Sequence, residues 1–395
     1  MSFPTRLDIP EPILQIAGTL ERAGFEAWCV GGTLRDALLG HPESDYDIAT
    51  SARPEQVQRL FPRTVAVGIK YGTVGVLDQH RVLHEVTTFR RDIVTDGRHA
   101  VVEYGVALDE DLARRDFTIN AIAYHPLRHE WRDPFGGNRD LEARLVRAVG
   151  DPGQRFREDY LRILRALRFA TRFDFVIEPR TWDAARAAAP GLAQLSAERV
   201  REEWFKGLQT ARSVSRLASL WIQVGAASIW IPELEEGSIS RIDGLEPPAT
   251  ARDPVLLTAL LTSKPGSVLR RLKASNAEVD RVLGMEKGPP APPAPVEASV
   301  RRWLSLVGGA ADDLLALWSL RQGHAPPWAE AVQAIRRRGD PLTRSDLAIT
   351  GTDLQGLGAS GPRIGHTLAA LLDRVLDDPA LNTRDKLLAL AKEMP

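Results

Sequence analysis

The chain has 395 residues but a single cysteine, Cys29. One cysteine excludes a disulfide framework and a cysteine-rich zinc site, and it is typical of a reducing cytoplasm. No run reaches the roughly 18 apolar residues that a membrane span requires. The start, MSFPTRLDIPEP, also lacks the apolar segment of a secretion signal. We therefore expect a cytoplasmic protein that makes no membrane contact.

An excess of charge of one sign is also absent. Lys and Arg number 51 and Asp and Glu 52, which gives a net charge of −1. This balance excludes the global basic field of a histone-like protein, so any contact with nucleic acid must come from a local patch. Lysine is scarce among the basic residues. Arginine suits bidentate phosphate binding, although a GC-rich genome explains the same bias.

The first 150 residues alternate short strand-like runs with helical ones, and the length allows two to four domains at about 100–200 residues each. Runs rich in β-branched and aromatic residues predict strands, and the residues between 77 and 82 predict a hairpin. Two helices are expected among them, over 11–24 and from Ser51, with Pro54 near the start, to Phe61. The predicted strands cover 27–30, 45–50, 73–77, 82–88 and 99–105.

Beyond residue 151 strand signals almost vanish, and apolar residues recur at spacings of three and four, which predicts helices. The segment 288–296, GPPAPPAPV, interrupts this pattern and is the best candidate for an internal linker. The sequence thus predicts a small-sheet α/β head followed by a long helical part.

A glycine pair stands directly after the first predicted strand, as Gly31-Gly32-x-x-Arg35-Asp36. Glycines let the backbone approach a ligand closely, and the following helix start favours an anion. Asp45 and Asp47 come next, and alternate residues of a strand share one face about 6.6 Å apart. Two such carboxylates suit Mg²⁺ bound together with substrate phosphates. A plain glycine turn before an ordinary strand end is the alternative.

Two further groups carry weaker signals. Glu85 is a charged residue inside an apolar strand run, which is unusual unless it faces a site. It could complete a carboxylate triad, or it could occupy an ordinary solvent-facing position. RRDFTINA brings together Arg114, Arg115, Asp116 and Asn120 just before an apolar run, and an exposed basic pair at such a boundary is common.

The segment 158–172 predicts one helix with two different faces. Arg165, Arg168 and Arg172 fall within about 60° of one another, with Arg162 at their flank. The opposite side is apolar. Asp159 lies one turn before Arg162, so an ordinary Asp–Arg salt bridge on a solvated face is one interpretation. Four stacked arginines with few acids beside them favour a polyanionic ligand instead.

In this order the motifs resemble the class II tRNA nucleotidyltransferases, the bacterial CCA-adding enzymes and their poly(A) polymerase relatives. The resemblance covers about half the chain, from 26 to 206. It is carried by GGTLRDALLG, DYDIAT, HEVTTFRRD, LARRDFTINAIAY, DPFGG, DLEARLVRAVGDP, REDYLRILRALRFATRF and LSAERVREEW. It implies an α+β fold with a polymerase-β-like nucleotidyltransferase head at 1–150. An all-α neck at 151–210, body at 211–287 and tRNA-binding tail at 296–395 would follow.

The resemblance also implies roles for individual residues. Asp45 and Asp47 would bind Mg²⁺, with two ions taking part, and Glu85 would be the third catalytic carboxylate. Asp159 and Arg162 would read the base of the incoming nucleotide. The RNA 3′-hydroxyl would attack the α-phosphate of CTP or ATP at the tRNA acceptor end and release pyrophosphate. The residues that would hold the nucleotide are Gly31, Gly32, Arg35, Arg115, Arg165 and Arg168.

Several alternatives stay open within and beyond this family. The full segment 90–105 favours complete CCA addition over CC addition, whereas an A-adding enzyme would keep the same segment. No stretch resembles the signature of poly(A) polymerases, and no His-Asp dipeptide occurs, so we expect no HD phosphohydrolase domain. A non-catalytic RNA-binding protein on this fold would have lost a metal carboxylate. A small-molecule nucleotidyltransferase would not need the long helical part.

Local basic clusters in the helical part are the candidate contacts to RNA outside the head. They occur at 270–273, 301–302 and 336–338. Such clusters can follow a phosphate backbone, but each can equally be an ordinary solvated face.

Overall fold

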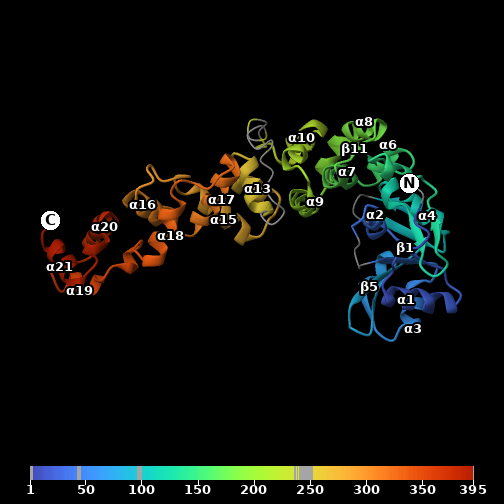
Figure 1. The fold of residues 1–395 in the computed structure, drawn as a ribbon, viewed down its shortest axis with the longest axis horizontal. Coiled ribbons are helices and arrows are strands. Elements are labelled where there is room, and N and C mark those ends of the chain that lie inside the picture. Colours follow the sequence, from blue (N-terminus) through green and yellow to red (C-terminus); the bar gives the residue numbers. More distant parts are fainter. Residues whose placement is uncertain are drawn as a thin grey trace. The chain divides into compact units, whose positions relative to one another are not determined.

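The computed structural model describes residues 3–41, 46–95, 100–234, 237, 239 and 252–394. The chain forms two compact units, Met1–Pro232 and Glu233–Pro395. Figure 1 follows the elements along the chain by colour, from the blue strands and helices of the first unit to the red helices at the C-terminus.

The first unit is built on a mixed sheet of seven strands in the order β3-β4-β5-β2-β1-β8-β9. Strand β2 runs parallel to β5, and the other neighbouring strands are antiparallel. A separate antiparallel pair is formed by β6 (Arg90–Thr95) and β7 (Ala100–Tyr104). The seven strands are β1 (Ala27–Val30), β2 (Asp47–Thr50), β3 (Thr64–Gly68), β4 (Thr73–Leu77), β5 (Leu83–Thr88), β8 (Ala123–His125) and β9 (Glu130–Arg132).

The five predicted strands are confirmed within the described residues, and so is the hairpin that joins β4 to β5. Strands β3, β6, β8 and β9 were missed, as were the two-residue strands β10 and β11 at 145–146 and 176–177. Strand β3 lies at the edge of the sheet with its three central residues exposed, so it lacks the alternation of buried and exposed residues that marks a half-buried strand. Strands β8 and β9 have only three residues each.

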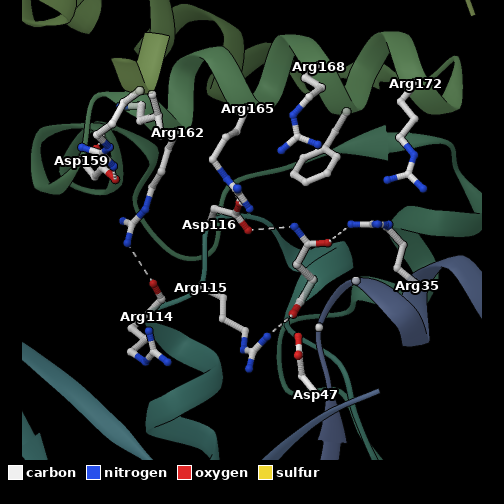
Figure 2. Close-up of a pocket in the computed structure, with 16 residues that line it drawn as sticks. Arg35, Asp47, Arg114, Arg115, Asp116, Asp159, Arg162, Arg165, Arg168 and Arg172 are labelled. Atoms are coloured by element: carbon white, nitrogen blue, oxygen red, sulfur yellow. Dashed lines mark hydrogen bonds and ion pairs between the residues drawn. The ribbon is translucent and has the colours of Figure 1, made fainter. Parts of the chain in front are cut away.

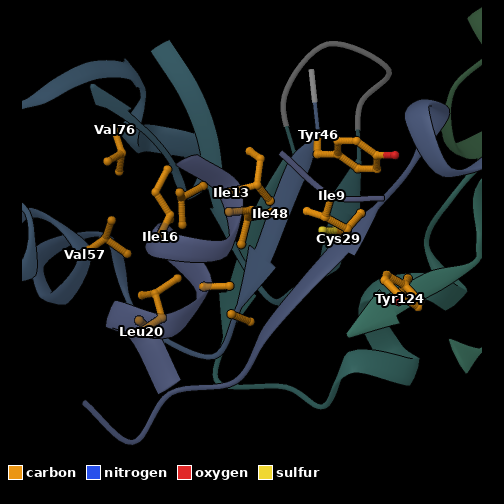
Figure 3. Packing of buried hydrophobic residues seen from close by; sticks show 14 of the residues in the cluster. Ile9, Ile13, Ile16, Leu20, Cys29, Tyr46, Ile48, Val57, Val76 and Tyr124 are labelled. Carbon is orange, nitrogen blue, oxygen red and sulfur yellow. The ribbon is translucent and has the colours of Figure 1, made fainter. Parts of the chain in front are cut away.

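Helices α1 (Glu11–Arg22) and α3 (Pro54–Leu60) cover one face of the sheet. Ile13, Ile16 and Leu20 recur at helical spacing on α1 and pack with Ile48 of β2 in one buried cluster (Figure 3). The helix expected from Ser51 begins instead at Pro54, because the Ser51 hydroxyl accepts the backbone N–H of Glu26 at 2.9 Å.

The other face of the sheet is buried by a second cluster that includes helix α4 (Leu108–Ala113). Strand β1 is buried on both sides: Ala27 and Cys29 belong to the first cluster, and Trp28 and Val30 to the second. This double burial fixes the end of β1, and therefore the position of the glycine pair that follows it.

Helices complete the first unit: α6 (Pro152–Glu158), α7 (Leu161–Phe173), α8 (Pro179–Ala188), α9 (Ala197–Thr210) and α10 (Val214–Val224). The predicted apolar face of α7 is confirmed, since Ile163, Leu164 and Leu167 are buried. Trp204 of α9 and Trp221 of α10 pack edge to face with ring centroids 4.8 Å apart. The short parallel pair β10 (Leu145–Val146) and β11 (Val176–Ile177) also lies here.

In its described residues, the second unit contains helices and no named strand, as predicted. It includes α13 (Pro254–Leu261), α14 (Pro265–Arg271), α15 (Asn276–Glu286), α16 (Glu297–Val307), α17 (Ala311–Gln322), α18 (Ala329–Arg338), α20 (Pro362–Asp377) and α21 (Arg384–Lys392). Within the described ranges no helix is both long and apolar enough to cross a bilayer.

The Pro-rich segment 288–296 lies inside the second unit, so it is not the boundary between the compact units. Its Pro289 carbonyl accepts the indole N–H of Trp303 at 2.8 Å. The segment joins α15 to α16, and the expectation of an internal linker there stays a prediction. The division into head, neck, body and tail stays a prediction.

The basic clusters of the second unit are largely ion-paired. Arg301 is buried and its guanidinium contacts Asp340 at 3.2 Å. Arg302 pairs with Asp377 at 2.8 Å, and Arg338 pairs with Glu297 at 2.6 Å. These arginines hold helices together, which reduces the charge that they would offer to RNA.

We expect the Ile13→Ala variant to be about 2–5 kcal/mol less stable than the parent chain, because the substitution leaves a cavity under α1. Chemical denaturation of the full chain measures this difference. The Gln15→Ala variant is the control, since Gln15 lies on the exposed side of the same helix, and it should change stability by less than about 0.5 kcal/mol. Equal losses in both variants would contradict the packing of α1 described above.

Candidate functional site

A cavity of about 510 Å³ opens where the end of β1 meets α7 (Figure 2). Its lining carries eight arginines and only three aspartates, so it is strongly positive. The lining residues are Gly31, Gly32, Arg35, Asp47, Arg114, Arg115, Asp116, Asn120, Asp159, Leu161, Arg162, Arg165, Arg168, Phe169, Arg172 and Arg199. All eight residues predicted to bind the nucleotide thus come together in one place.

Gly31 lines this cavity directly after the last residue of β1. Its φ of 88° lies in the left-handed region, which favours glycine. A Cβ atom here would lie 3.3 Å from Nη1 of Arg115 and 3.5 Å from Oδ2 of Asp47. The glycine therefore leaves the space between a guanidinium and a carboxylate open. Helix α2 (Gly32–Leu38) starts immediately after it.

Arg35 lines the cavity but is already engaged by the protein. Its side chain is buried, with Nε 2.9 Å from Oδ1 of Asp36 and Nη1 2.5 Å from Oδ1 of Asn120. Burial lowers the pKa of the Arg35 guanidinium, and the charge of Asp36 opposes that shift. The Arg35 guanidinium, which we expected to bind a phosphate, therefore donates to Asp36 and Asn120 in this structure.

Asp116 is the buried acid at the centre of the site. Its Oδ1 accepts the side-chain amide of Asn120 at 2.9 Å, and its Oδ2 accepts Nε of Arg165 at 2.7 Å. Burial by itself would raise the pKa of the Asp116 carboxyl. The charge of Arg165 and the hydrogen bonds to the carboxylate outweigh burial and bring the pKa to about 2.

The arginine stripe of α7 is confirmed, and Figure 2 shows its side chains directed to one side of the helix. The expectation that few acids accompany it is wrong. Each arginine has an acidic partner, and three of these acids come from other parts of the chain, where helical spacing cannot reveal them. The pairs are Arg162–Glu158 at 2.7 Å, Arg165–Asp116 at 2.7 Å, Arg168–Glu203 at 2.7 Å and Arg172–Asp36 at 3.0 Å.

Asp159 and Arg162 do not share a helix, contrary to the prediction. Helix α6 ends at Glu158, Asp159 is extended with φ −155° and ψ 105°, and α7 begins at Leu161. The Asp159 carboxylate accepts the Leu161 N–H at 3.0 Å and an Arg199 N–H at 2.7 Å. These bonds explain the break, because the side chain caps the first turn of α7.

Among the described residues, Asp159 and Arg162 do not form a salt bridge with each other. Asp159 pairs with Arg199, and Arg162 pairs with Glu158. Arg162 donates to the carbonyls of Arg155 and Arg114 at 3.0 and 3.1 Å and to Glu158. Both side chains nevertheless line the same cavity.

Of the three predicted catalytic carboxylates, the structure places Asp47 at the cavity. Asp45 lies outside the described residues, and Glu85 is exposed on β5 without lining the cavity. The register pairs Ile48 with Val86, so Asp47 and Glu85 are cross-strand neighbours on the opposite face. Within the described ranges, no three His, Cys, Asp or Glu side chains come together as a metal site.

Phe169, Glu203 and Arg199 were missed by sequence reasoning. The Phe169 ring lies 4.4 Å from the guanidinium carbon of Arg168 and 4.9 Å from that of Arg35, which are cation–π distances. In the sequence Phe169 looks like any core aromatic of a helix, and α9 shows no pattern that marks Glu203 or Arg199. Only the fold brings α9 beside α7.

Taken together, the site is a positive cavity with an exposed carboxylate at its edge. Buried acids hold the arginines in place before any ligand arrives, which lowers the cost of ordering them. Such an arrangement suits a polyphosphate ligand.

Family models match two parts of the chain. That of the poly A polymerase head domain matches residues 27–147. That described as the probable RNA and SrmB-binding site of polymerase A matches residues 174–237.

Similarity to single relatives extends over nearly the whole chain. A CCA-adding enzyme of Lacticaseibacillus paracasei is 34% identical over 98% of each chain. That of Latilactobacillus sakei is 35% identical over 96% of this chain and 97% of the relative.

Solved structures of CCA-adding enzymes are also similar to this chain. The Bacillus stearothermophilus CCA-adding enzyme in complex with CTP matches with a TM-score of 0.79 and 33% identity, covering 97% of this chain and 96% of that one. The Thermotoga maritima CCA-adding enzyme complexed with tRNA matches with a TM-score of 0.65 at 20% identity over 96% of this chain and 93% of that one, which supports the fold alone. The predicted α+β fold class is therefore confirmed.

We expect Asp116→Asn to lower stability at pH 7 by roughly 2 kcal/mol. The carboxyl pKa falls from 3.8 to about 2 on folding, so its contribution is present above pH 3.8 and is lost as the pH falls towards 2. Urea unfolding of both proteins between pH 7 and 3 measures this. The difference between them should begin to narrow below about pH 4. A difference that did not change with pH would contradict the charged pairing with Arg165.

Proposed function

This chain belongs to the family of CCA-adding enzymes and is a nucleotidyltransferase, and from that premise we propose how it works. It transfers CMP and AMP from CTP and ATP to the 3′ end of tRNA without a nucleic-acid template, and it releases pyrophosphate. The observation that carries the proposal is the arginine-lined cavity with Asp47 at its edge. The similar CCA-adding enzymes, one of them solved in complex with CTP, support the choice of substrates.

The arginines act on the triphosphate. Arg165 and Arg168 present guanidinium groups that buried acids have already oriented, and Arg115 lies 3.3 Å from the Cβ position of Gly31. Charge-assisted hydrogen bonds from such groups are about twice as strong as neutral ones. We assign the β- and γ-phosphates to this arginine cluster, so that pyrophosphate departs from there.

The carboxylates fit Mg²⁺ by the chemistry of their donors. Asp47 is exposed, and Glu85 lies beside it on the neighbouring strand, so hard oxygen ligands are available at the edge of the cavity. We propose that Asp45 and Asp47 hold Mg²⁺ and that Glu85 is the third catalytic carboxylate. When bound, Mg²⁺ stabilises charge that develops on the phosphate oxygens. The residues of the chain orient the α-phosphate between the arginines and these carboxylates.

Asp159 and Arg162 supply the base selection through hydrogen-bond polarity. Cytosine and adenine both present an amino donor beside a ring-nitrogen acceptor, whereas guanine and uracil present the reverse. A carboxylate only accepts and a guanidinium only donates. The bonds of Arg162 to described residues occupy three of its five N–H groups, so donors remain for the ring nitrogen. The pair would accept C and A and reject G and U.

The experiment that tests the function combines the purified protein with Mg²⁺, labelled nucleotides and a tRNA that lacks its terminal CCA. Complete addition of CCA from CTP and ATP is the expected outcome. Extension by A alone, and only on a tRNA that already ends in CC, would instead identify an A-adding enzyme. No incorporation at all would favour a non-catalytic RNA-binding protein.

We expect Asp45→Ala and Asp47→Ala to abolish incorporation while tRNA binding and thermal stability stay close to those of the parent chain. Removing one of several clustered carboxylates costs the free protein little, whereas the reaction loses a group that orients the phosphate. Single-turnover incorporation and a tRNA binding assay measure the two effects. The matched control is Glu55→Ala, an exposed carboxylate of α3. Substantial turnover by the double aspartate variant would contradict the assignment.

We expect Asp159→Ala to raise UTP and GTP incorporation relative to CTP and ATP by one to two decades, about 1.4–2.8 kcal/mol. The carboxylate that requires an amino donor is lost, while Arg162 remains. Single-nucleotide extension with each nucleotide in turn measures this ratio. Asp183→Ala, at an exposed position of α8, should leave the ratio unchanged. An equal loss for all four nucleotides would show that Asp159 only caps α7 and pairs with Arg199.

A further inference from the structure

Residues that lie next to one another on neighbouring strands form a row across the sheet. This row runs from the cavity past Asp47 and Glu85 to the edge strand β3. Val30 is paired with Asp47, and Asp47 lies next to Glu85 because Ile48 is paired with Val86. Glu85 is paired with Gly75, and Gly75 with Val65 of the edge strand β3. Paired residues point to the same face, at strand spacings of about 4.8 Å. The row therefore starts at the cavity and continues away from it.

The part of this row beyond Glu85 is apolar and accessible. Val65 and Val67 are 42% and 46% exposed, which is unusual for two valines on one short strand. A Cβ on Gly75 would lie 2.8 Å from Cγ2 of Val67 and 2.7 Å from Cδ1 of Leu83. Because Gly75 has no side chain, the side chains of Val67 and Leu83 lie over it and form a shallow apolar surface.

Two hydroxyls complete this surface, those of Thr73 and Thr87, which lie 3.0 Å apart on the same face. We call Val65, Val67, Thr73, Gly75, Leu83 and Thr87 the open face. These six residues are uncharged, in contrast to the cavity with its eight arginines, and the carboxylate of Glu85 lies among them between Leu83 and Thr87.

The in-line geometry of phosphoryl transfer assigns a role to the open face. Attacking and leaving oxygens lie roughly in line across the phosphorus in phosphoryl transfer. Under the proposed function, on which this inference rests, pyrophosphate leaves from the arginine side of Asp47. The attacking hydroxyl must then approach from the opposite side, where Glu85 and the open face lie.

We propose that the open face binds the 3′-terminal nucleotides of the acceptor RNA and delivers their hydroxyl to Asp47 and Glu85. An apolar surface with hydroxyls suits bases and riboses, which single-stranded RNA ends expose. It does not suit a phosphate, which requires positive charge. A second copy of the chain is the other occupant that an exposed edge strand invites, but that occupant would have no reason to adjoin the carboxylates.

Thiol labelling tests this contact directly. The native Cys29 is fully buried, and burial raises the pKa of its thiol, so a Val65→Cys variant presents one reactive thiol. A tRNA that lacks its CCA should slow maleimide labelling of that thiol about tenfold. Neither CTP alone nor a tRNA whose acceptor strand is trimmed by several more nucleotides should protect it.

Val82→Cys is the matched control, because Val82 is 53% exposed on the hairpin before β5 and lies outside the row. Its labelling should not respond to RNA. Protection of Val65→Cys by higher protein concentration alone would overturn the proposal in favour of a contact between copies of the chain. Equal protection by the trimmed tRNA would overturn it as well, since the terminal nucleotides would then not be the group bound.

Kinetics give a second readout. Val65→Glu places a negative charge on the open face, so the KM for tRNA should rise about tenfold while the KM for CTP stays within about twofold. Val82→Glu should change neither value. If the parent chain extends tRNA but Val65→Glu keeps a normal KM for tRNA, this inference fails and the proposed function stands. If the parent chain extends no tRNA, the proposed function fails first.

Discussion

The site depends on the neutralisation of arginine by buried carboxylates. Asp36, Asp116 and Glu203 are almost inaccessible to solvent, and each pairs with an arginine of α7. An unpaired charge in such a position would be strongly destabilising. The acids therefore require the arginines as much as the arginines require the acids. This mutual requirement ties α7 to α2, to α9 and to the segment that follows α4, and so fixes the arginines that line the cavity.

That geometry explains how a pocket with eight arginines stays ordered without a ligand. Like charges at helical spacing repel one another, and each arginine of the α7 stripe is compensated by a carboxylate from the preceding helix or from another part of the fold. Phe169 adds a shared aromatic face for Arg35, Arg165 and Arg168. A triphosphate then meets guanidinium groups that are already oriented, although it must share them with the acids.

Local sequence patterns predicted those features of the fold that depend on residues close together in the sequence. The strands β1, β4 and β5, the glycine pair and the apolar face of α7 were all correct, because burial alternates or recurs over a few residues. The resemblance to a family added the roles of the motifs. The break at Asp159 was missed, since the bond from Leu161 N–H to the carboxylate competes with a helix that propensity alone would continue. The acids that pair with α7 were missed because Asp36 and Arg172 are 136 residues apart. Their pairing follows from the fold and has no local signal.

The same separation has a consequence for biosynthesis. A ribosome makes the sheet strands, Asp36 and Asp116 well before it completes α7, and Glu203 of α9 comes later still. Until α7 emerges, Asp36 has its neighbour Arg35 as an ionic partner, whereas the cation that pairs with Asp116 in the finished fold does not yet exist. Burial of the Asp116 carboxylate is opposed during this interval by the cost of desolvating its charge. In this chain the arginine-lined cavity is therefore among the last features of the first unit to form.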